Sequence, residues 1–161
     1  HFFIQEDTFT VPIIGKILEL ADQIPVVVGQ GQDAIAMARE RLKMGNAVGI
    51  FPEGRMSGSR EVRRAGAGAA LLAMETGVPL VPVGFYVEPK FVKEIKGHFH
   101  DRDTVGWWQM GGNCIVNIGE PWQLAMQEKT DRSYRYVREL SDKLMNNIQE
   151  LVNQASMKFN Y

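Results

Sequence analysis

The sequence predicts an α/β fold in which a largely parallel or mixed central sheet is flanked by helices. Short apolar runs typical of strands alternate along the chain with longer segments of helical periodicity, and this alternation is typical of α/β domains. The chain has 161 residues, of which 45% are hydrophobic and 23% charged, as in an ordinary globular protein. We therefore expect one domain over residues 1–161, which would bury about 70% of the surface of its unfolded chain.

The spacing of apolar residues predicts nine elements, because short continuous or alternating runs indicate strands and spacings of three and four indicate helices. In chain order they are a strand near 2–4, a helix near 11–21, a strand near 25–28, a helix near 33–44, a strand near 47–51, a helix near 66–76, strands near 80–86 and 113–118, and a helix near 132–153. In the helix 33–44, Ile35, Ala38 and Leu42 share the face that would cover a core, and Gly45 ends it.

The last expected helix has one apolar face, and Asp131 is expected to cap it because it lies before the first turn. The apolar residues of this face are Val137, Leu140, Leu144, Ile148 and Leu151. The opposite face mixes acids and amides with few bases, which favours a helix docked on the domain over one that lies on a membrane.

Two segments leave alternatives open. The helix 11–21 is apolar around most of its circumference, so part of it is free to face an acyl chain, a lipid or a further N-terminal segment. The connection from Glu88 to Gly112 has no clear period and is expected to be a long loop. Its Trp107 and Trp108 suit a membrane interface or an acyl groove, and equally suit two rings packed on the edge of the core.

Composition excludes several classes of protein. The formal net charge of −1 argues against a general nucleic-acid binder. The single cysteine, Cys114, lies in the strand 113–118 and is expected to be a buried, inert thiol, so no disulfide framework is possible within the chain. No cluster of metal ligands is evident, and we expect neither a metal nor a cofactor. No apolar run approaches the ~20 residues that span a bilayer.

The segment Phe51-Pro52-Glu53-Gly54-Arg55-Met56-Ser57 follows an apolar run and combines a chain break with charged side chains. Pro52 has no N–H to continue the pairing of a strand, and Gly54 lets the backbone come close to a ligand. Glu53 and Arg55 are therefore expected at the carboxyl end of a strand, where open α/β sheets bind ligands. Taken alone, the same residues also fit an ordinary turn with a solvated arginine.

Positive charge gathers directly after this turn. Between residues 51 and 70 there are four arginines, at positions 55, 60, 63 and 64, against two glutamates, at positions 53 and 61. Arginine suits phosphate because its planar guanidinium donates paired, charge-assisted hydrogen bonds. The surplus of arginine therefore predicts an anionic ligand at this turn.

Several segments together resemble the glycerophospholipid acyltransferase family, typified by 1-acylglycerol-3-phosphate acyltransferase. The family's third motif reads Phe-Pro-Glu-Gly-Thr-Arg-Ser and is followed by a Gly-Ala-Ala helix, Gly-Val-Pro and Val-Pro-Val. The matching segments here are Phe51–Ser57, Gly68–Gly77 and Val78–Val83, with Phe2–Gly15, Asp22–Val28 and Val116–Pro121 similar to other family segments in the same order. The resemblance covers most of the chain and implies a glycerolipid acyltransferase-like fold.

The chain departs from the family in its catalytic motif. The family's first motif, a His followed after four residues by an Asp, belongs upstream of all these segments, so we expect this chain, which begins at His1, to be an N-terminally truncated acyltransferase-like domain. In the family, that His takes the proton from the acceptor hydroxyl and the Asp orients its ring. His1 with Glu6 and His98 with Asp103 lie at the wrong place relative to the third motif, and we interpret both as decoys.

Two phosphate contacts of the family also change. Val28 stands where the second motif usually has an Arg, and Arg55 stands one position early in the third motif, with Met56 in the usual Arg position. A guanidinium therefore remains in the loop but is expected to aim differently, and Arg63 or Arg64 is placed to compensate.

The resemblance implies an O-acyltransferase of phospholipid synthesis that moves a fatty acyl group from acyl-CoA or acyl carrier protein to the hydroxyl of a glycerophosphate or lysophosphatidate. It implies association with the cytoplasmic face of a membrane without a membrane-spanning segment in this chain. The substrate-binding residues implied are Glu53, Gly54, Arg55, Ser57, Arg63, Arg64 and Pro82. No catalytic base is identifiable, and we expect little or no transfer by this chain.

Two alternatives remain at this point. Gly29, Gly31 and Ala34 fit the Gly-x-Gly-x-x-Gly/Ala fingerprint of a dinucleotide-binding module, with Glu53 near the end of the next strand. Asp33 argues against this function because it places a negative charge at the helix N-terminus where the pyrophosphate would bind, although it is also a good cap. The second alternative is a degenerate family member that binds lipid or phosphate without catalysis.

Overall fold

The computed structural model describes residues 1–54, 64–99, 102–124 and 133–158. Its elements are β1 (Phe3–Gln5), the 3₁₀ helix η1 (Glu6–Thr10), α1 (Ile14–Leu20), β2 (Ile24–Val26), α2 (Gly31–Lys43), α3 (Gly68–Thr76), β3 (Val83–Val87), the 3₁₀ helix η2 (Pro89–Phe91), β4 (Val92–Phe99), β5 (Arg102–Gln109), β6 (Cys114–Ile118) and α4 (Tyr134–Met157). The four expected helices and four of the five expected strands are present. The α/β class is therefore confirmed.

Strand directions are mixed, as expected, but the described strands form three separate two-stranded ladders and no continuous central sheet. β1 and β2 are parallel, whereas β3–β6 and β4–β5 are antiparallel. The expected strand 47–51 forms a single parallel bridge, between Gly49 and Phe2, the residue before β1. Pro52 limits this strand, because proline ends the supply of backbone donors directly after the apolar run.

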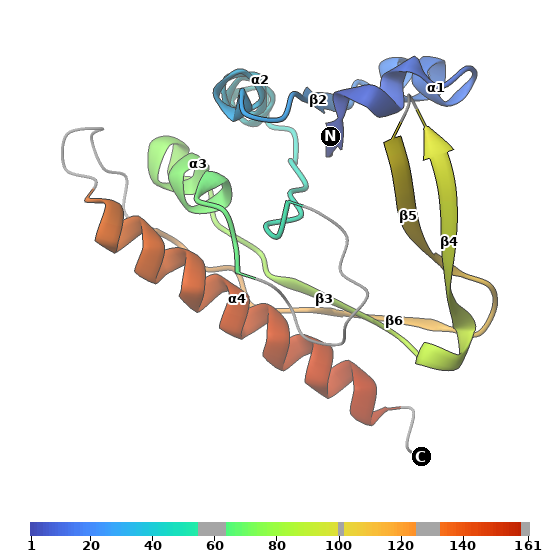
Figure 1. Cartoon of the computed structure of the whole chain (residues 1–161). Coiled ribbons are helices and arrows are strands. Elements are labelled where there is room, and N and C mark those ends of the chain that lie inside the picture. The colour runs from blue at the N-terminus through green and yellow to red at the C-terminus, as the bar shows by residue number, and fades with distance from the viewer. Residues whose placement is uncertain (55–63, 100–101, 125–132, 159–161) are drawn as a thin grey trace.

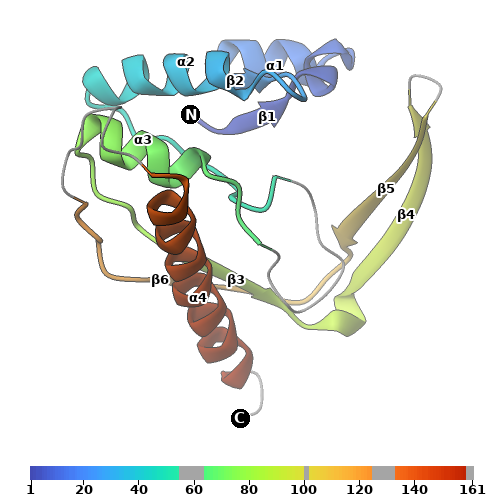
Figure 2. The same cartoon turned by 60° about the vertical axis from the view of Figure 1, so that its left-hand side comes forward.

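Helix α3 lies between α2 and α4 and joins the two hydrophobic clusters of the core (Figures 1 and 2). Ala70, Ala73 and Met74 pack with Val137 and Leu140 of α4 in one cluster. On its other side, α3 contributes Leu72 to a cluster with Ile24, Ala34 and Ala38 from β2 and α2. A helix that is apolar all round is typical of a buried position, and the small residues of α3 allow both neighbours to approach closely.

Helix α2 ends as its sequence predicts. Gly45 adopts a φ of 82°. Its N–H donates to the carbonyl of Leu42 at 3.0 Å, and the N–H of Asn46 donates to the carbonyl of Arg41 at 3.0 Å. This pair of hydrogen bonds satisfies carbonyls that the helix end leaves free. On the exposed face, Lys43 donates a hydrogen bond to Glu40 and lowers the pKa of that carboxyl.

Helix α4 covers one face of the β3–β6 ladder (Figure 2). A Cβ added at Gly84 would lie 2.7 Å from the Cβ of Leu151, so the strand approaches the helix at glycine distance. Beside it, Asn117 donates from its side chain to the carbonyl of Leu151 at 2.9 Å. The docked amphipathic helix is confirmed, but its cap is Ser133, which accepts from the N–H of Tyr136, and the expectation of Asp131 is wrong.

The opposite face of the β3–β6 ladder is apolar and exposed. Phe85 pairs with Val116, and both side chains are exposed, as is Ile118, which pairs with Val83 two positions along on the same face. Cys114 lies on the same face and is also exposed, so the expectation of a buried thiol is wrong. The alternation of β6 was interpreted correctly as a strand, but the face that carries Cys114 has no covering element among the described residues.

The connection 88–112 is not a loop, contrary to the expectation. It forms η2 and the antiparallel ribbon β4–β5, which extends away from α4 in both views (Figures 1 and 2). A two-stranded ribbon with solvent near both faces needs no apolar alternation, which is why no strand period is readable. Trp107 is half-buried, whereas Trp108 is exposed, so the two rings do not pack together on the edge of the core.

Helix α1 keeps much of its apolar surface exposed, as its sequence suggests. The exposed fraction is 73% for Ile13, just before the helix, and 89% for Leu20 at its end. Ile13 has a φ of 71°, an uncommon conformation for a β-branched residue. In the part of the chain that the structure describes, no helix combines the length and the apolar character needed to cross a membrane.

Candidate acceptor-binding site

The turn after the apolar run 47–51 is built as the sequence predicts. The N–H of Gly54 donates to the carbonyl of Phe51 at 3.0 Å, and Gly54 has a φ of 68°, which glycine adopts without strain. Glu53, which precedes Gly54 in this turn, is half-buried. The N–H of Gly66 then donates to the carbonyl of Pro52 at 2.8 Å. This hydrogen bond brings the two ends of the segment 54–64 together.

Helix α4 holds the second end of this segment. The guanidinium of Arg138 donates to the carbonyl of Ala65 at 2.8 Å and to the carboxylate of Asp142 at 2.7 Å. Asp142 also lies 3.6 Å from the guanidinium of Arg64. Ala65 is buried, whereas the side chain of Arg64 is 78% exposed. An exposed guanidinium opposite a single carboxylate at this distance gains little from the pair and stays accessible to another anion.

The hydrogen bond between Gly66 and Pro52 therefore joins the backbone segments that carry three of the predicted site residues. Glu53, Gly54 and Arg64 lie at the two joined ends of one segment. Arg55, Ser57 and Arg63 lie outside the described residues, and their roles stay predictions. Sequence reasoning missed Arg138 and Asp142, and no sequence signal relates them to residue 65, because their spacing of four on α4 fits any exposed ion pair.

Pro82 is placed elsewhere. It is buried and lines a cavity of about 190 Å³. The cavity lies between α4 and the residues just before β3 and just after β6. The other lining residues are Gly119, Glu120, Asn147, Glu150, Leu151 and Gln154. Two carboxylates in this cavity disfavour a phosphate by like-charge repulsion. The cavity does not include Glu53, Gly54 or Arg64, and the role of Pro82 in substrate binding stays a prediction.

The two histidine decoys both have an aspartate partner in space. His98 and Asp103 are directly opposite each other in the β4–β5 ribbon, with Nδ1 of the imidazole 3.0 Å from the carboxylate. Their side chains are 63% and 98% exposed. A general base is normally shielded in a pocket with its substrate, and an exposed ribbon supplies no such shielding.

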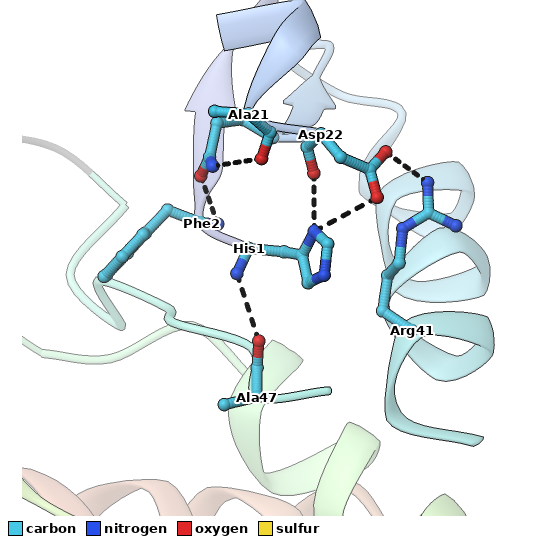
Figure 3. A network of polar contacts seen from close by, with 7 residues as sticks. His1, Phe2, Ala21, Asp22, Arg41 and Ala47 are labelled. Carbon is cyan, nitrogen blue, oxygen red and sulfur yellow. Dashed lines mark hydrogen bonds and ion pairs between the residues drawn. The ribbon is translucent and has the colours of Figure 1, made fainter. Parts of the chain in front are cut away.

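His1 is paired with Asp22 and not with Glu6, the residue that its spacing suggested (Figure 3). Nδ1 of His1 lies 2.6 Å from the carbonyl oxygen of Asp22 and 3.2 Å from its carboxylate, which also accepts from Arg41 at 2.6 Å. Phe2 pairs with Gly49 in parallel, so His1 lies at the amino end of this strand pair. Glu53 follows its carboxyl end, and the two side chains are at opposite ends.

Of the glycines in the dinucleotide-like pattern, Gly29 lies in the turn between β2 and α2, and Gly31 is the first residue of α2. Gly29 has a φ of 85°, and the N–H of Gln30 donates to the carbonyl of Val27 at 3.0 Å. Asp33 lies in the first turn of α2, where its carboxylate would oppose a pyrophosphate. The turn alone accounts for Gly29, because a positive φ favours glycine.

The described part of the chain holds no cluster of potential metal ligands. Across residues 1–54, 64–99, 102–124 and 133–158, the His, Cys, Asp and Glu side chains form no group of three that is placed to hold a metal ion. The turn at Glu53 and Gly54, here called the Glu53 turn, offers a carboxylate and backbone N–H groups, and Arg64 offers a guanidinium. These groups suit binding of a phosphate and a neighbouring hydroxyl.

Comparisons with known proteins give a family match and a similarity in fold. The acyltransferase family model matches residues 1–86, and no curated protein matches. Among solved structures, the chain is similar to the 1-acyl-sn-glycerophosphate (LPA) acyltransferase PlsC from Thermotoga maritima, with 19% identity and a TM-score of 0.64. The similarity covers 95% of this chain and 55% of that chain, so this chain spans about half the length of the relative. The family model covers more than half of the 161 residues, and the chain belongs to the acyltransferase family.

Proposed function

We propose that this chain supplies the acceptor-binding half of an O-acyltransferase of phospholipid synthesis. The acceptor would be a glycerophosphate or lysophosphatidate, and the donor an acyl-CoA or acyl carrier protein thioester. One observation carries the proposal: the N–H of Gly66 donates a hydrogen bond to the carbonyl of Pro52. This bond joins the backbone that carries Glu53 and Gly54 to the backbone that carries Arg64. The solved relative is named for transfer to 1-acyl-sn-glycerophosphate, an acceptor of this chemical class.

In this proposal each residue has a separate role. Arg64 binds the phosphate of the acceptor through charge-assisted hydrogen bonds, together with Arg55 and Arg63 from the intervening segment. Glu53 accepts a hydrogen bond from the glycerol portion, while Gly54 leaves room for the backbone to approach it. Ser57 donates a further hydrogen bond. Binding of this kind lowers the barrier to transfer by positioning the acceptor hydroxyl toward the thioester carbon.

Transfer also needs a group that takes the proton from the acceptor hydroxyl. The two His–Asp pairs that the structure describes lie on an exposed ribbon and at the far end of a strand pair, away from the Glu53 turn. A second candidate function follows from this placement, namely that the chain binds the glycerophosphate headgroup without catalysing transfer. Both candidates share the same binding site and differ only in turnover.

We further propose that the protein works at the cytoplasmic surface of a membrane, where its lipid substrates reside. The exposed apolar side chains of Ile13, just before α1, and of Ile14, Ile17 and Leu20 in it support location at a membrane surface, since such a cluster suits the boundary between headgroups and acyl chains. Loss of vesicle binding on Leu20→Ser would support it, and undiminished binding would count against a role for α1.

Calorimetric titration tests the binding function. Glycerol 3-phosphate should bind the chain, whereas glycerol should not, because the phosphate supplies the attraction. NADH serves as the probe for the dinucleotide alternative. Equal heats for glycerol and glycerol 3-phosphate would contradict the proposal, and saturable binding of NADH alone would favour the dinucleotide-binding module instead.

A further inference from the structure

We propose that Arg138 of α4 is a positioning residue that fixes the backbone at Ala65 and, through Asp142, orients the phosphate-binding side chain of Arg64. The proposal rests on the function proposed above for the Glu53 turn. The contacts through which Arg138 would act are its hydrogen bonds to the Ala65 carbonyl and to the Asp142 carboxylate.

The geometry of Arg138 suits this role. One terminal nitrogen donates to the Ala65 carbonyl at 2.8 Å, and the other donates to Asp142 at 2.7 Å. The planar guanidinium therefore holds a backbone atom and a carboxylate in fixed relation, which a lysine ammonium, as a point charge, does not reproduce. The side chain of Arg138 is only 23% exposed, so both hydrogen bonds are partly protected from competing water.

The contacts of the two residues that flank Ala65 in the chain explain why its position matters. The next residue, Gly66, donates to the carbonyl of Pro52, which directly precedes Glu53. The preceding residue, Arg64, faces Asp142 at 3.6 Å. Displacement of Ala65 would therefore disturb both the closure of the turn and the guanidinium at its end. Helix α4 is anchored to the core by Val137 and Leu140, and it offers a rigid support for both.

Asp142 has a second consequence for the site. Its carboxylate is shared between Arg138 and Arg64, and the shorter contact is the one to Arg138. Arg138 thus offsets part of the charge that Asp142 presents to Arg64. We expect this to leave Arg64 oriented by Asp142 yet free to exchange that carboxylate for a phosphate, whose charge is larger.

The test compares Arg138→Gln with Arg135→Gln, a matched control one turn earlier on α4. Arg135 also pairs with an acid four residues on, Glu139 at 3.0 Å, but both side chains are exposed. Two quantities are measured by NMR and calorimetry: the rate of amide hydrogen exchange at Gly66 and the dissociation constant for glycerol 3-phosphate.

We expect Arg138→Gln to speed exchange at Gly66 by about tenfold, as loss of a charge-assisted hydrogen bond implies, and to weaken glycerol 3-phosphate binding by a similar factor. Arg138→Lys should restore neither quantity fully, and Arg135→Gln should change neither. Unchanged exchange at Gly66 in a folded Arg138→Gln variant would overturn the proposal. Because exchange is read without ligand, this result is independent of whether the chain binds glycerol 3-phosphate at all.

Asp142→Asn gives a second route should Arg138→Gln not fold. It keeps the hydrogen bond from Arg138 to Ala65 but removes the charge that faces Arg64. Exchange at Gly66 should then stay within about twofold of the unmodified chain, while the dissociation constant for glycerol 3-phosphate changes. A large rise in exchange with no change in binding would contradict the division of roles between Ala65 and Asp142.

Discussion

Arg64 is the predicted phosphate contact whose surroundings the structure describes. Its guanidinium is 78% exposed and faces Asp142 at a distance too long for a strong ion pair. We predict that Arg64→Gln weakens binding of glycerol 3-phosphate by about tenfold, the effect of one lost charge-assisted contact of 1.4 kcal/mol. Calorimetry on the variant measures this. Binding as tight as in the unmodified chain would exclude Arg64 from the site.

The exposed pair of His98 and Asp103 allows a test of the catalytic expectation. We predict that the 161-residue chain transfers no measurable acyl group from acyl-CoA to lysophosphatidate, because neither described His–Asp pair adjoins the Glu53 turn. His98→Ala should leave the result unchanged in an assay that follows free thiol release. Robust transfer that His98→Ala abolishes would show that this pair is the base after all.

Single residues also show where sequence reasoning stops. The turn at Glu53 and Gly54 could be predicted, because Pro52 and Gly54 act on the backbone locally. The exposure of Cys114 could not, because it depends on whether another element covers the second face of β6. The contact of Arg138 with Ala65 joins residues 73 positions apart and has no local signature.

At the level of elements, the close approach of β3 to α4 depends on Gly84. A Cβ at this position would lie 2.7 Å from the Cβ of Leu151 and 2.8 Å from the backbone N of Val152. We predict that Gly84→Ala lowers the free energy of unfolding by about 1–3 kcal/mol, because strand or helix must shift. Urea denaturation measures the change.

Gly31→Ala is the matched control for this prediction. A Cβ at Gly31 meets nothing within 4 Å, and the residue begins α2. Alanine there should be neutral or stabilising by up to about 1 kcal/mol, because it favours the helix. Equal destabilisation by the two substitutions would mean that the contact at Gly84 is not what limits the packing of α4.

Elements were predicted well where one apolar face meets a core. In α2, Ile35, Ala38 and Leu42 all lie in or against one hydrophobic cluster. In α4, Val137 and Leu140 lie in the other cluster, and Leu144 is buried. The ribbon β4–β5 was missed because its strands face solvent widely and carry charged residues such as Lys93 and Lys96, which do not alternate with apolar ones as in a half-buried strand.

The whole molecule leaves one face of the β3–β6 ladder uncovered among the residues that the structure describes. Phe85, Val116 and Ile118 share this face and are exposed. A contiguous exposed apolar patch marks an interaction surface in most soluble proteins. It would also bind an apolar dye, and this gives a direct measure of its exposure.

We predict that Ile118→Lys changes the free energy of unfolding by less than about 0.5 kcal/mol and lowers dye fluorescence, because the side chain is 71% exposed. Ile115→Lys on the same strand should cost more than about 1 kcal/mol, since its side chain points to the other face, toward α4. Similar costs for both would show that the outer face is covered in solution.

The family and the fold class could be predicted from the order of motifs along the whole chain. The family match over residues 1–86 confirms the predicted family. The division of the strands into three ladders could not, because pairing between strands far apart in sequence depends on the complete set of strands. The prediction of one domain over 1–161 stays a prediction.

The central claim is that the turn joined by Gly66 and Pro52 binds the phosphate of the acceptor. The most direct measurement is an NMR titration of the chain with glycerol 3-phosphate, followed through backbone amide shifts. We predict saturable shifts at Gly54, Arg64 and Gly66, with Gly29 and Gly31 unchanged. Saturation that moves only Gly29 and Gly31, or no saturable shift at Gly54 and Gly66, would contradict the account.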